Sequence, residues 1–309
     1  MRLLIVGAGA TGGFFGVKLA RAGRDVTFLV HPERVADLRK NGLRLTGILG
    51  DERIDPQLTT AADLDSPYDV ILLAVKATAL AQSMDDIAPA VGPDTAILPI
   101  LNGISHLDQL NDRFGKDKVL GGVAVLATSA ERAGEINVLT SDAKLTAGDQ
   151  DGASTPRTER VRELFGGAGF EFAVTDAILA AMWSKWVFIA STTAVTCLMR
   201  GTIGDVNSVP GGFAWSRSVL AEAAAVAEAA NFPVGKAEFM SYQATLTEPG
   251  SSYAPSFYRD LVKGRPIEVE HVLGDFSRRA AALAVGTPFL DLATMNLRVY
   301  EQRREQSRR

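Results

Sequence analysis

Three glycines near the start of the chain, Gly7, Gly9 and Gly12, have the spacing G-x-G-x-x-G. In this motif the first glycine makes a tight turn, the second lets the backbone approach a pyrophosphate, and the third lets a helix pack on a strand. The helix that follows offers unpaired N–H groups and the positive end of its dipole to phosphates. The motif therefore predicts a dinucleotide site, whose contacting residues would be Gly7, Ala8, Gly9, Ala10, Thr11 and Gly12.

The segments around the glycines have the properties that such a site needs. Residues 3–6 form a continuous apolar run, residues 11–22 have helical apolar spacing that ends at Gly23, and residues 25–30 predict a second strand. This strand–helix–strand context favours the dinucleotide interpretation over a glycine-rich turn in some other α/β unit.

Polar residues follow two further strand-like runs, at 69–75 and 95–100. Lys76 comes directly after the first run and Asn102 shortly after the second. Because the carboxyl ends of strands in an open α/β sheet face the ligand crevice, Lys76 could reach a phosphate or ribose, and Asn102 could bond a carboxamide or a substrate oxygen. A snorkelling surface lysine and an Asn-Gly turn are the alternative interpretations.

The residues after the second strand bear on which nicotinamide cofactor is bound. NAD sites usually place Asp or Glu there to accept from the ribose hydroxyls, whereas this chain has His31 and Arg34 within four residues. A guanidinium is always charged and can bind a phosphate through two hydrogen bonds, so the pattern favours NADP, with Arg34 at the 2′-phosphate. Glu33 in the acceptor's role, or Arg34 as an exposed helix residue, would remove this preference.

Two candidates for proton chemistry lie in the second half of the chain. Lys185 is flanked by Trp183 and Trp186, and partial desolvation there would lower its pKa and make its proton available for general acid catalysis. Glu268, in a stretch with helical spacing from 265 to 284, could steer the lysine or a ribose. A lysine that snorkels from a buried helix and a solvated surface carboxylate are the alternatives.

The pattern of elements predicts two domains, as expected for 309 residues. Strand signals, including short ones at 43–46 and 53–54, dominate up to residue 175, whereas 176–200, 214–230 and 265–284 have helical spacing. We expect an α/β protein with a Rossmann-type parallel-sheet domain over 1–175, which binds NADP, and an all-helical domain over 176–309, which carries substrate and catalytic groups.

Composition excludes several other classes of protein. An apolar content of 47% and a net charge of −4 are typical of a soluble globular protein, and no basic face with interleaved aromatics indicates nucleic-acid binding. No apolar run reaches the roughly 18 residues of a membrane helix, and the first strand leaves no room for a signal peptide. The single Cys197 fits a reducing compartment, and the three histidines lack metal-ligand spacing. We therefore expect a cytoplasmic protein without a metal site.

Five motifs, in their order and spacing, resemble the ketopantoate reductase family: residues 7–13, 75–77, 101–103, 183–185 and 264–270. The resemblance covers essentially the whole chain and implies NADPH-dependent reduction of 2-dehydropantoate (ketopantoate) to pantoate, in the pathway to pantothenate and coenzyme A. It implies that Lys185 is the proton donor and that Glu268 contacts the cofactor and orders the site. The other residues that the resemblance assigns are Lys76, Asn102 and Ala130 at the cofactor, and Asn102 and Ser256 at the substrate.

Two departures from the family pattern leave the substrate open. Ile189 and Thr193 occupy positions where the family often has asparagines that bond the substrate, and His31 stands where the family commonly has its phosphate-binding arginine, so that Arg34 would take over. A more apolar 2-oxo acid or ketone is thus an alternative substrate, and a non-catalytic NADP-binding regulator is an alternative of another class. Apolar helix faces, such as 221–230, could form a homodimer contact or be core.

Overall fold

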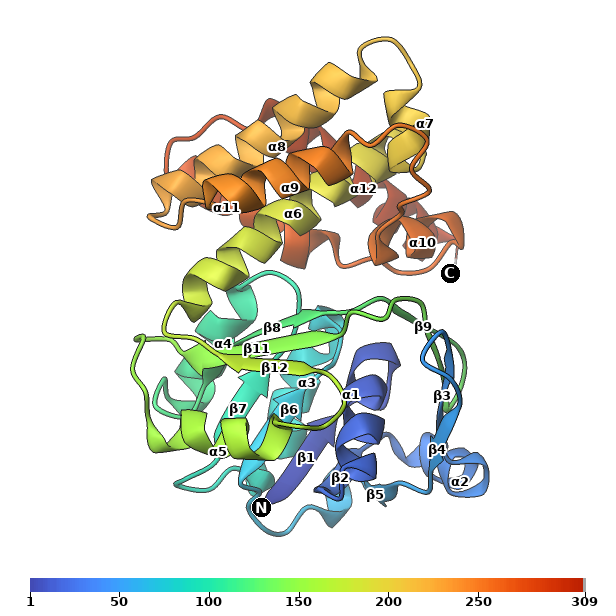
Figure 1. Cartoon of the computed structure of the whole chain (residues 1–309), viewed down its shortest axis with the longest axis vertical. Helices are drawn as coiled ribbons and strands as arrows, with labels where there is room; N and C mark the ends of the chain where they lie inside the picture. Colours follow the sequence, from blue (N-terminus) through green and yellow to red (C-terminus); the bar gives the residue numbers. More distant parts are fainter. Residues whose placement is uncertain (308–309) are drawn as a thin grey trace. The chain divides into compact units, whose positions relative to one another are not determined.

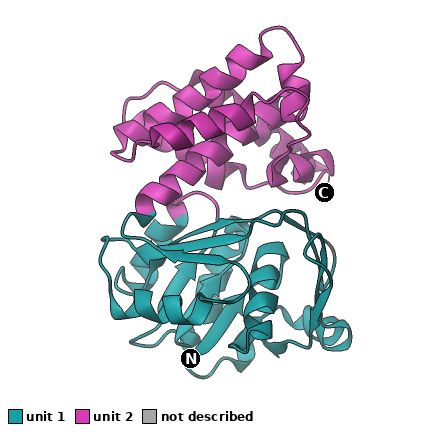
Figure 2. Cartoon of the chain, viewed as in Figure 1, with its two compact units in different colours: residues 1–101, 106–178 teal, residues 102–105, 179–309 magenta. Residues whose placement is uncertain are grey.

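A computed structural model describes residues 1–307 of the chain, apart from the side chain of Glu131, as two compact units. Unit 1 comprises residues 1–101 and 106–178, and unit 2 comprises residues 102–105 and the chain from 179 onward (Figure 2). Segment 102–105 therefore belongs to unit 2, although it interrupts unit 1 in the sequence.

Unit 1 is built around a parallel sheet of five strands in the order β5-β2-β1-β6-β7. Its strands are β1 (Arg2–Val6), β2 (Asp25–Leu29), β5 (Gln57–Thr59), β6 (Val70–Leu73) and β7 (Ala96–Pro99). The register sets Leu3 beside Val26 on one side and Val70 on the other. Four of these strands were expected, and the apolar runs of β1, β6 and β7 are buried as predicted. The strand order reverses at β1 and β6, which makes their carboxyl ends the place where a ligand of such a sheet binds.

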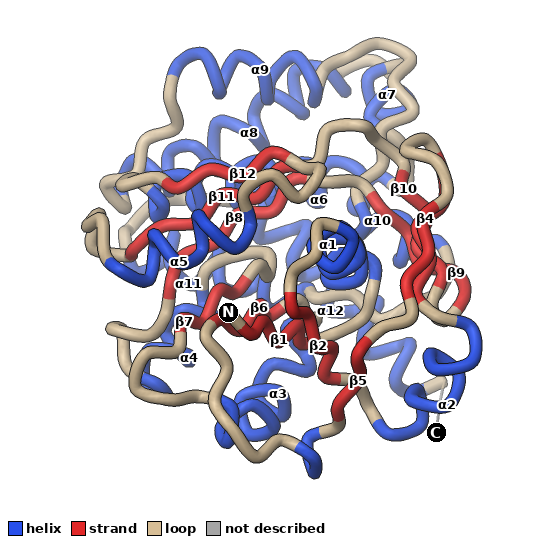
Figure 3. Tube along the Cα trace, turned by 60° about the horizontal axis from the view of Figure 1, so that its bottom comes forward, coloured by secondary structure: helices blue, strands red, loops and turns tan. Residues whose placement is uncertain are grey.

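Helices cover both faces of this sheet. In Figure 3, α3 (Leu80–Ile87) and α4 (Ser105–Phe114) lie on one side of the row of strands and α1 (Ala10–Arg21) lies on the other. The other helices of unit 1 are α2 (Pro32–Asn41), α5 (Pro156–Phe165), and the short 3₁₀ helices η1 (Ala61–Asp63), η2 (Ala77–Ala79) and η3 (Ala88–Ala90). The apolar faces of α1, α2 and α5 and one face of the sheet form a core that includes the fully buried Phe14, Phe15 and Phe28.

Two smaller sheets complete unit 1. One has the order β4-β3-β10-β9, formed by β3 (Leu43–Gly47), β4 (Glu52–Ile54), β9 (Thr128–Arg132) and β10 (Glu135–Val138). The β3–β4 hairpin confirms the short strands expected at 43–46 and 53–54, whereas β9 and β10 were not expected. The other sheet has the order β12-β11-β8, formed by β8 (Leu120–Val125), β11 (Lys144–Asp149) and β12 (Glu171–Val174).

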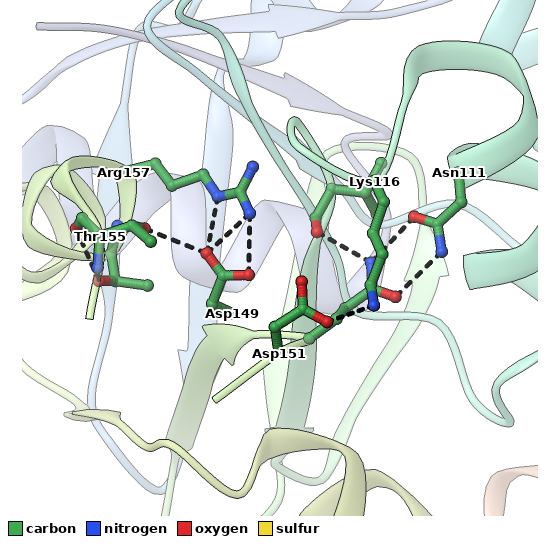
Figure 4. Close-up of polar contacts among 9 residues, drawn as sticks. Asn111, Lys116, Asp149, Asp151, Thr155 and Arg157 are labelled. Atoms are coloured by element: carbon green, nitrogen blue, oxygen red, sulfur yellow. Dashed lines mark hydrogen bonds and ion pairs between the residues drawn. The ribbon is translucent and has the colours of Figure 1, made fainter. Parts of the chain in front are cut away.

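A buried ion pair joins β11 to α5 (Figure 4). Asp149, only 2% exposed, accepts hydrogen bonds from Arg157 Nε at 3.0 Å and Nη2 at 2.8 Å, and from Thr155 Oγ1 at 3.1 Å. Thr155 is also the N-cap of α5, where it accepts from the Thr158 backbone. Lys116 and Asp151 form a nearby ion pair whose side chains are both exposed to solvent (Figure 4).

Unit 2 is all-helical, as the sequence predicted (Figure 1). Its helices are α6 (Ile178–Met199), α7 (Ile203–Asn207), α8 (Gly212–Ala229), α9 (Lys236–Leu246), α10 (Ser256–Val262), the π-helix η4 (Glu270–Gly274), α11 (Asp275–Ala282) and α12 (Pro288–Gln306). Helix α8 contacts α9 and α12, and η4 contacts α11 and α12. The expected helix from residue 265 was wrong at its start: residues 265–268 are not helical, because Pro266 lacks an N–H and its ring disfavours the helical conformation for the residue before it.

Helix α6 is long and apolar enough to cross a membrane by length and composition, with a mean hydropathy of 1.4 over its best 18-residue window. The helix passes this test although it contains no uninterrupted apolar run of 18 residues, since a lysine, serines and threonines interrupt it. The structure buries 67% of that window, as it would for a core helix of a soluble protein, which passes the same test.

Candidate active site

The glycine motif forms an open cradle after β1. Gly7 has φ +98°, and a Cβ atom built there would lie 3.1 Å from the Ala74 carbonyl oxygen, so only glycine suits this turn. A Cβ on Gly12 would overlap the carbonyl oxygen of Gly7 and lie 2.8 Å from Cβ of Ala74. By contrast, a Cβ on Gly9 would have no atom within 4 Å. Gly7 and Gly12 therefore have the turn and packing roles that the motif predicts, and Gly9 leaves room beside the backbone.

The N–H groups of the first turn of α1 border the open space beside Gly9. Gly9 is the N-cap, no side chain caps the helix, and its first turn contains no acidic residue. Thr11 and Ala10 are half-buried there, and Ala8 is buried. The positive end of the helix dipole is thus not neutralised by a neighbouring carboxylate of the first turn, which is the arrangement that favours a bound phosphate.

Three basic residues follow β2 and β6, the two strands that flank β1 in the parallel sheet. His31 follows β2 and is exposed; it begins α2, and its carbonyl accepts from the Arg34 N–H at 2.9 Å. Arg34 is half-buried in the first turn of α2, and Lys76 follows β6 and is exposed. Because parallel strands end at one edge, the structure brings these residues to the same edge as the glycine cradle. Ala130 lies elsewhere, exposed on β9 of the second sheet.

An aromatic cluster fixes the rotation of α6 in unit 2. Trp186 is fully buried, donates from Nε1 to the Val272 carbonyl at 2.8 Å, and packs edge-on against Phe276 with ring centres 4.7 Å apart. Trp183 stacks on Phe232 and is 4% exposed. Ser184 and Lys185 lie between the two tryptophans, so the packing of the rings determines where the Lys185 side chain points.

Lys185 is half-buried, and desolvation lowers the pKa of its ammonium from the ordinary 10.5 to about 8. Desolvation acts this way because burial penalises the charged form of an amine. The lowered pKa that the flanking tryptophans suggested is therefore found, and it leaves an ammonium that can release its proton near neutral pH.

Polar groups beside Lys185 form a chain that the sequence analysis missed. The Ser184 and Tyr242 hydroxyls are 3.0 Å apart, and Tyr242 donates to Glu238 Oε1 at 2.8 Å. Burial raises the pKa of Tyr242 above its usual range, so this hydroxyl keeps its proton. The partners lie 58 positions apart in sequence, so no local pattern could have indicated the contact.

Ile189 and Thr193 follow Lys185 by one and two helical turns, as expected. Ile189 is half-buried, whereas Thr193 is fully buried, and its Oγ1 has no hydrogen-bond partner among residues 1–307. Of the two expected substrate contacts on α6, only Ile189 keeps exposed surface. Thr193 as a substrate ligand stays a prediction that its burial does not favour.

The remaining expected residues of unit 2 come from three separate segments. Glu268 is half-buried between the buried Ile267 and Val269, just before the helical residues, and its carbonyl accepts from the His271 and Val272 N–H groups. Asn102 is half-buried in segment 102–105, and Ser256 is exposed as the first residue of α10. Among the described residues, no group of three or more His, Cys, Asp or Glu side chains could hold a metal ion.

Known proteins are similar to this chain over nearly its full length. The family Ketopantoate reductase PanE/ApbA matches residues 3–152, and Ketopantoate reductase PanE/ApbA C terminal matches residues 177–301. Uncharacterized oxidoreductase YkpB of Bacillus subtilis is 30% identical over 301 residues, which cover 97% of this chain and 99% of YkpB. The crystal structure of 2-dehydropantoate 2-reductase from Methylococcus capsulatus is similar with a TM-score of 0.85 and 27% identity, covering 98% of both chains.

A further solved structure has the same fold at lower identity. D-mandelate dehydrogenase, in a ternary structure with NADH and anilino(oxo)acetate, is similar with a TM-score of 0.88 at 20% identity, covering 99% of both chains. The first family match covers the glycine cradle of unit 1, the second covers helix α6 of unit 2, and the similarity to YkpB extends over both. The chain is a member of the ketopantoate reductase family of oxidoreductases.

Proposed function

We propose that this protein is an NADPH-dependent reductase of a 2-oxo acid, with 2-dehydropantoate as the first candidate substrate and pantoate as its product. The observation that carries the proposal is the combination of an open glycine cradle in unit 1 with Lys185, a half-buried lysine of lowered pKa, in unit 2. In this scheme residues 1–175 bind the cofactor, and residues 176–309 supply the substrate-binding and catalytic groups of a cytoplasmic enzyme.

The cofactor-binding part of the proposal rests on the open space beside Gly9 and on the positively charged groups near it. The open space at Gly9 and the N–H groups of α1 suit a pyrophosphate, and Arg34 at the end of β2 suits the 2′-phosphate that distinguishes NADPH from NADH. Lys76, His31 and Asn102 would complete the cofactor contacts. When bound, NADPH supplies the hydride that reduces the carbonyl carbon.

The catalytic part of the proposal assigns proton donation to Lys185 Nζ. Lys185 Nζ, which is mostly protonated at pH 7 with a pKa of about 8, would donate to the carbonyl oxygen as negative charge develops there. Glu268 would contact the cofactor and orient the lysine, and Ser256 would hydrogen-bond the substrate. D-mandelate dehydrogenase, a protein of this fold, binds an oxo acid analogue, which is consistent with a 2-oxo acid as substrate.

A second candidate substrate is a more apolar 2-oxo acid. Ile189 presents hydrocarbon one turn after Lys185, where an amide would be needed to hydrogen-bond a hydroxylated substrate. A polar group left without its hydrogen bond costs about 1–3 kcal/mol, so a substrate lacking that hydroxyl gains relative to ketopantoate.

The first experiment measures NADPH oxidation with ketopantoate beside 2-oxo acids of branched aliphatic and aromatic side chains. Turnover of ketopantoate with the highest kcat/KM supports the first candidate, and turnover only of the apolar acids supports the second. NADPH binding without oxidation of any acid in the panel would contradict the proposal and favour a non-catalytic regulator.

A second experiment tests the cofactor preference through Arg34. Because a charge-assisted hydrogen bond contributes about 1.5–3 kcal/mol, Arg34→Ala should raise the KM for NADPH roughly tenfold or more and leave the KM for NADH unchanged. Arg39→Ala, an exposed arginine in the last turn of the same helix, is the matched control and should change neither. Equal losses with both cofactors would remove Arg34 from the 2′-phosphate.

A further inference from the structure

Residues 102–105, the Asn102 loop, pack against the π-helix η4 within unit 2. The Ser105 hydroxyl lies 2.9 Å from His271 Nδ1, and the backbone of Asn102 lies near enough to the same imidazole to raise its pKa. The imidazole thus contacts the last residue of the loop directly and lies near the first. This contact holds the loop to η4 through Ser105.

The backbone of the loop also approaches η4 closely. Gly103 has φ +74°, and a Cβ atom built there would lie 2.9 Å from the carbonyl oxygen of His271. A side chain at this position would therefore push the loop away from the helix, in a conformation that L-residues rarely adopt. The glycine and the imidazole together keep the loop at a fixed distance from His271.

His271 is also tied to the other expected site residue of this region. Its N–H donates to the Glu268 carbonyl at 3.2 Å, and the N–H of Val272 donates to the same carbonyl at 3.1 Å. Glu268 is thereby held as the residue on which the helical segment begins. π-Helical turns such as η4 are rare and occur frequently at functional sites.

The imidazole is suited to this contact at neutral pH. Burial lowers the pKa of His271 below the ordinary 6.5, while the backbone of Asn102 and the charge of Asp275 act in the opposite direction. A neutral imidazole has one N–H donor and one acceptor nitrogen, so Nδ1 can share a hydrogen bond with the Ser105 hydroxyl in either tautomer.

We propose that His271 is a positioning residue, which links the Asn102 loop to the Glu268 segment and so fixes the Asn102 side chain relative to the Glu268 carboxylate. The inference rests on the proposed function, in which both side chains serve the reaction. His271 itself touches neither reactant; it acts through Asn102. Because displacement of a binding group by about 1 Å can cost up to a hundredfold in rate, loss of the link should be measurable in kcat/KM.

The decisive experiment is a double-mutant cycle between His271 and Asn102. His271→Phe keeps an aromatic ring and removes the hydrogen bonds, so kcat/KM should fall roughly tenfold to a hundredfold in the parent protein. In an Asn102→Ala background the same substitution should cost less than about threefold, because the side chain that His271 positions is already gone. His271→Gln, which retains a donor and an acceptor, should recover part of the loss. Equal losses in both backgrounds would overturn the positioning role.

Hydrogen exchange reports on the loop independently of turnover. Amides of residues 102–105 should exchange faster in His271→Phe and in the milder Ser105→Ala variant, which keeps the test valid if the first variant folds poorly. Arg298→Gln is the matched control, since it breaks the ion pair with Glu270 on the same π-helix but leaves the loop contact intact. Unchanged exchange in the two loop variants would overturn the inference. A wild-type enzyme without turnover on any oxo acid would instead overturn the proposed function.

Discussion

Replacing Lys185 by methionine should make the protein more stable and nearly inactive. The folded state lowers the pKa of this lysine from 10.5 to about 8, and at 1.36 kcal/mol for each pH unit this difference corresponds to about 3 kcal/mol. That free energy is an upper bound, since Lys185 keeps some solvent exposure. At pH 7 the lysine is charged in both states, so the folded state bears the full cost.

The sign of the pH dependence follows from the direction of the pKa change. Because the folded pKa lies below the unfolded one, the cost is complete below pH 8, decreases between pH 8 and 10.5, and vanishes above that range. Lys185→Met should therefore raise the free energy of unfolding by up to about 3 kcal/mol at pH 7, and by much less at pH 10.5. The long apolar chain of methionine preserves most of the packing of the lysine stem.

Urea unfolding followed by tryptophan fluorescence measures this change in the free energy of unfolding for unit 2. All three tryptophans, Trp183, Trp186 and Trp215, lie in unit 2, so their emission follows the unit that contains Lys185. Lys236→Met, at an exposed lysine of α9 in the same unit, is the control and should change the free energy by less than about 0.5 kcal/mol.

Catalysis should change in the opposite direction to stability. Loss of a general acid costs roughly a hundredfold or more in kcat, whereas the dissociation constant of NADPH should be unaffected. In the wild-type enzyme, kcat/KM should fall tenfold per pH unit above pH 8, because only the protonated lysine can donate. A Lys185→Met variant less stable than the parent protein at pH 7 would refute the reasoning from burial. A wild-type kcat/KM that declines only above pH 10 would refute it as well.

Three further sets of substitutions test the glycine cradle, the substrate contact and the stability of the fold. Gly9→Ala should leave the midpoint of urea unfolding unchanged and abolish detectable NADPH binding, whereas Gly12→Ala should lower the midpoint itself, because only the second added methyl group overlaps protein atoms. Ile189→Asn should raise kcat/KM for ketopantoate relative to an apolar oxo acid by tenfold or more, worth about 1.4 kcal/mol; no change in that ratio would mean that residue 189 does not contact the substrate. Asp149→Ala, which leaves the Arg157 guanidinium, 14% exposed, without its partner, should lower the free energy of unfolding by up to about 3–5 kcal/mol, while Asp151→Ala at the exposed pair should cost about 1 kcal/mol or less. Equal effects of the last two variants in urea unfolding would contradict the burial argument.

The parts of the fold that the sequence predicted are those with local signals. The run at residues 3–6 and the glycines after it specify a strand, a turn and a helix within about twenty positions, and the structure has all three. Strand β10 was missed, because it is held by parallel pairing with β3, as in the register of Glu135 with Arg44, and β9 is an edge strand that pairs only with β10. Such a pairing joins distant segments and leaves little periodicity in either strand.

The candidate site likewise contains residues that a local sequence signal indicated and residues that only the fold brings together. Lys185 could be found because two tryptophans lie beside it in the sequence, whereas its neighbour Ser184 meets Tyr242 only through the packing of two helices. The burial of Thr193 was equally hidden, since a threonine two turns beyond a lysine looks the same whether or not a neighbouring helix covers it. His271 showed no sequence signal at all, because its partner Ser105 lies 166 positions away.

The division of unit 2 into residues 102–105 and a long C-terminal stretch has a consequence for how such enzymes can recombine. A single genetic crossover near residue 178 would bring in a foreign set of helices but retain the original Asn102 loop. Gly103 and Ser105 would then face a π-helix with which they had not evolved. Exchange of the helical unit between relatives should therefore succeed only when both segments are transferred together, and substitutions in residues 102–105 and 270–274 should be inherited as pairs.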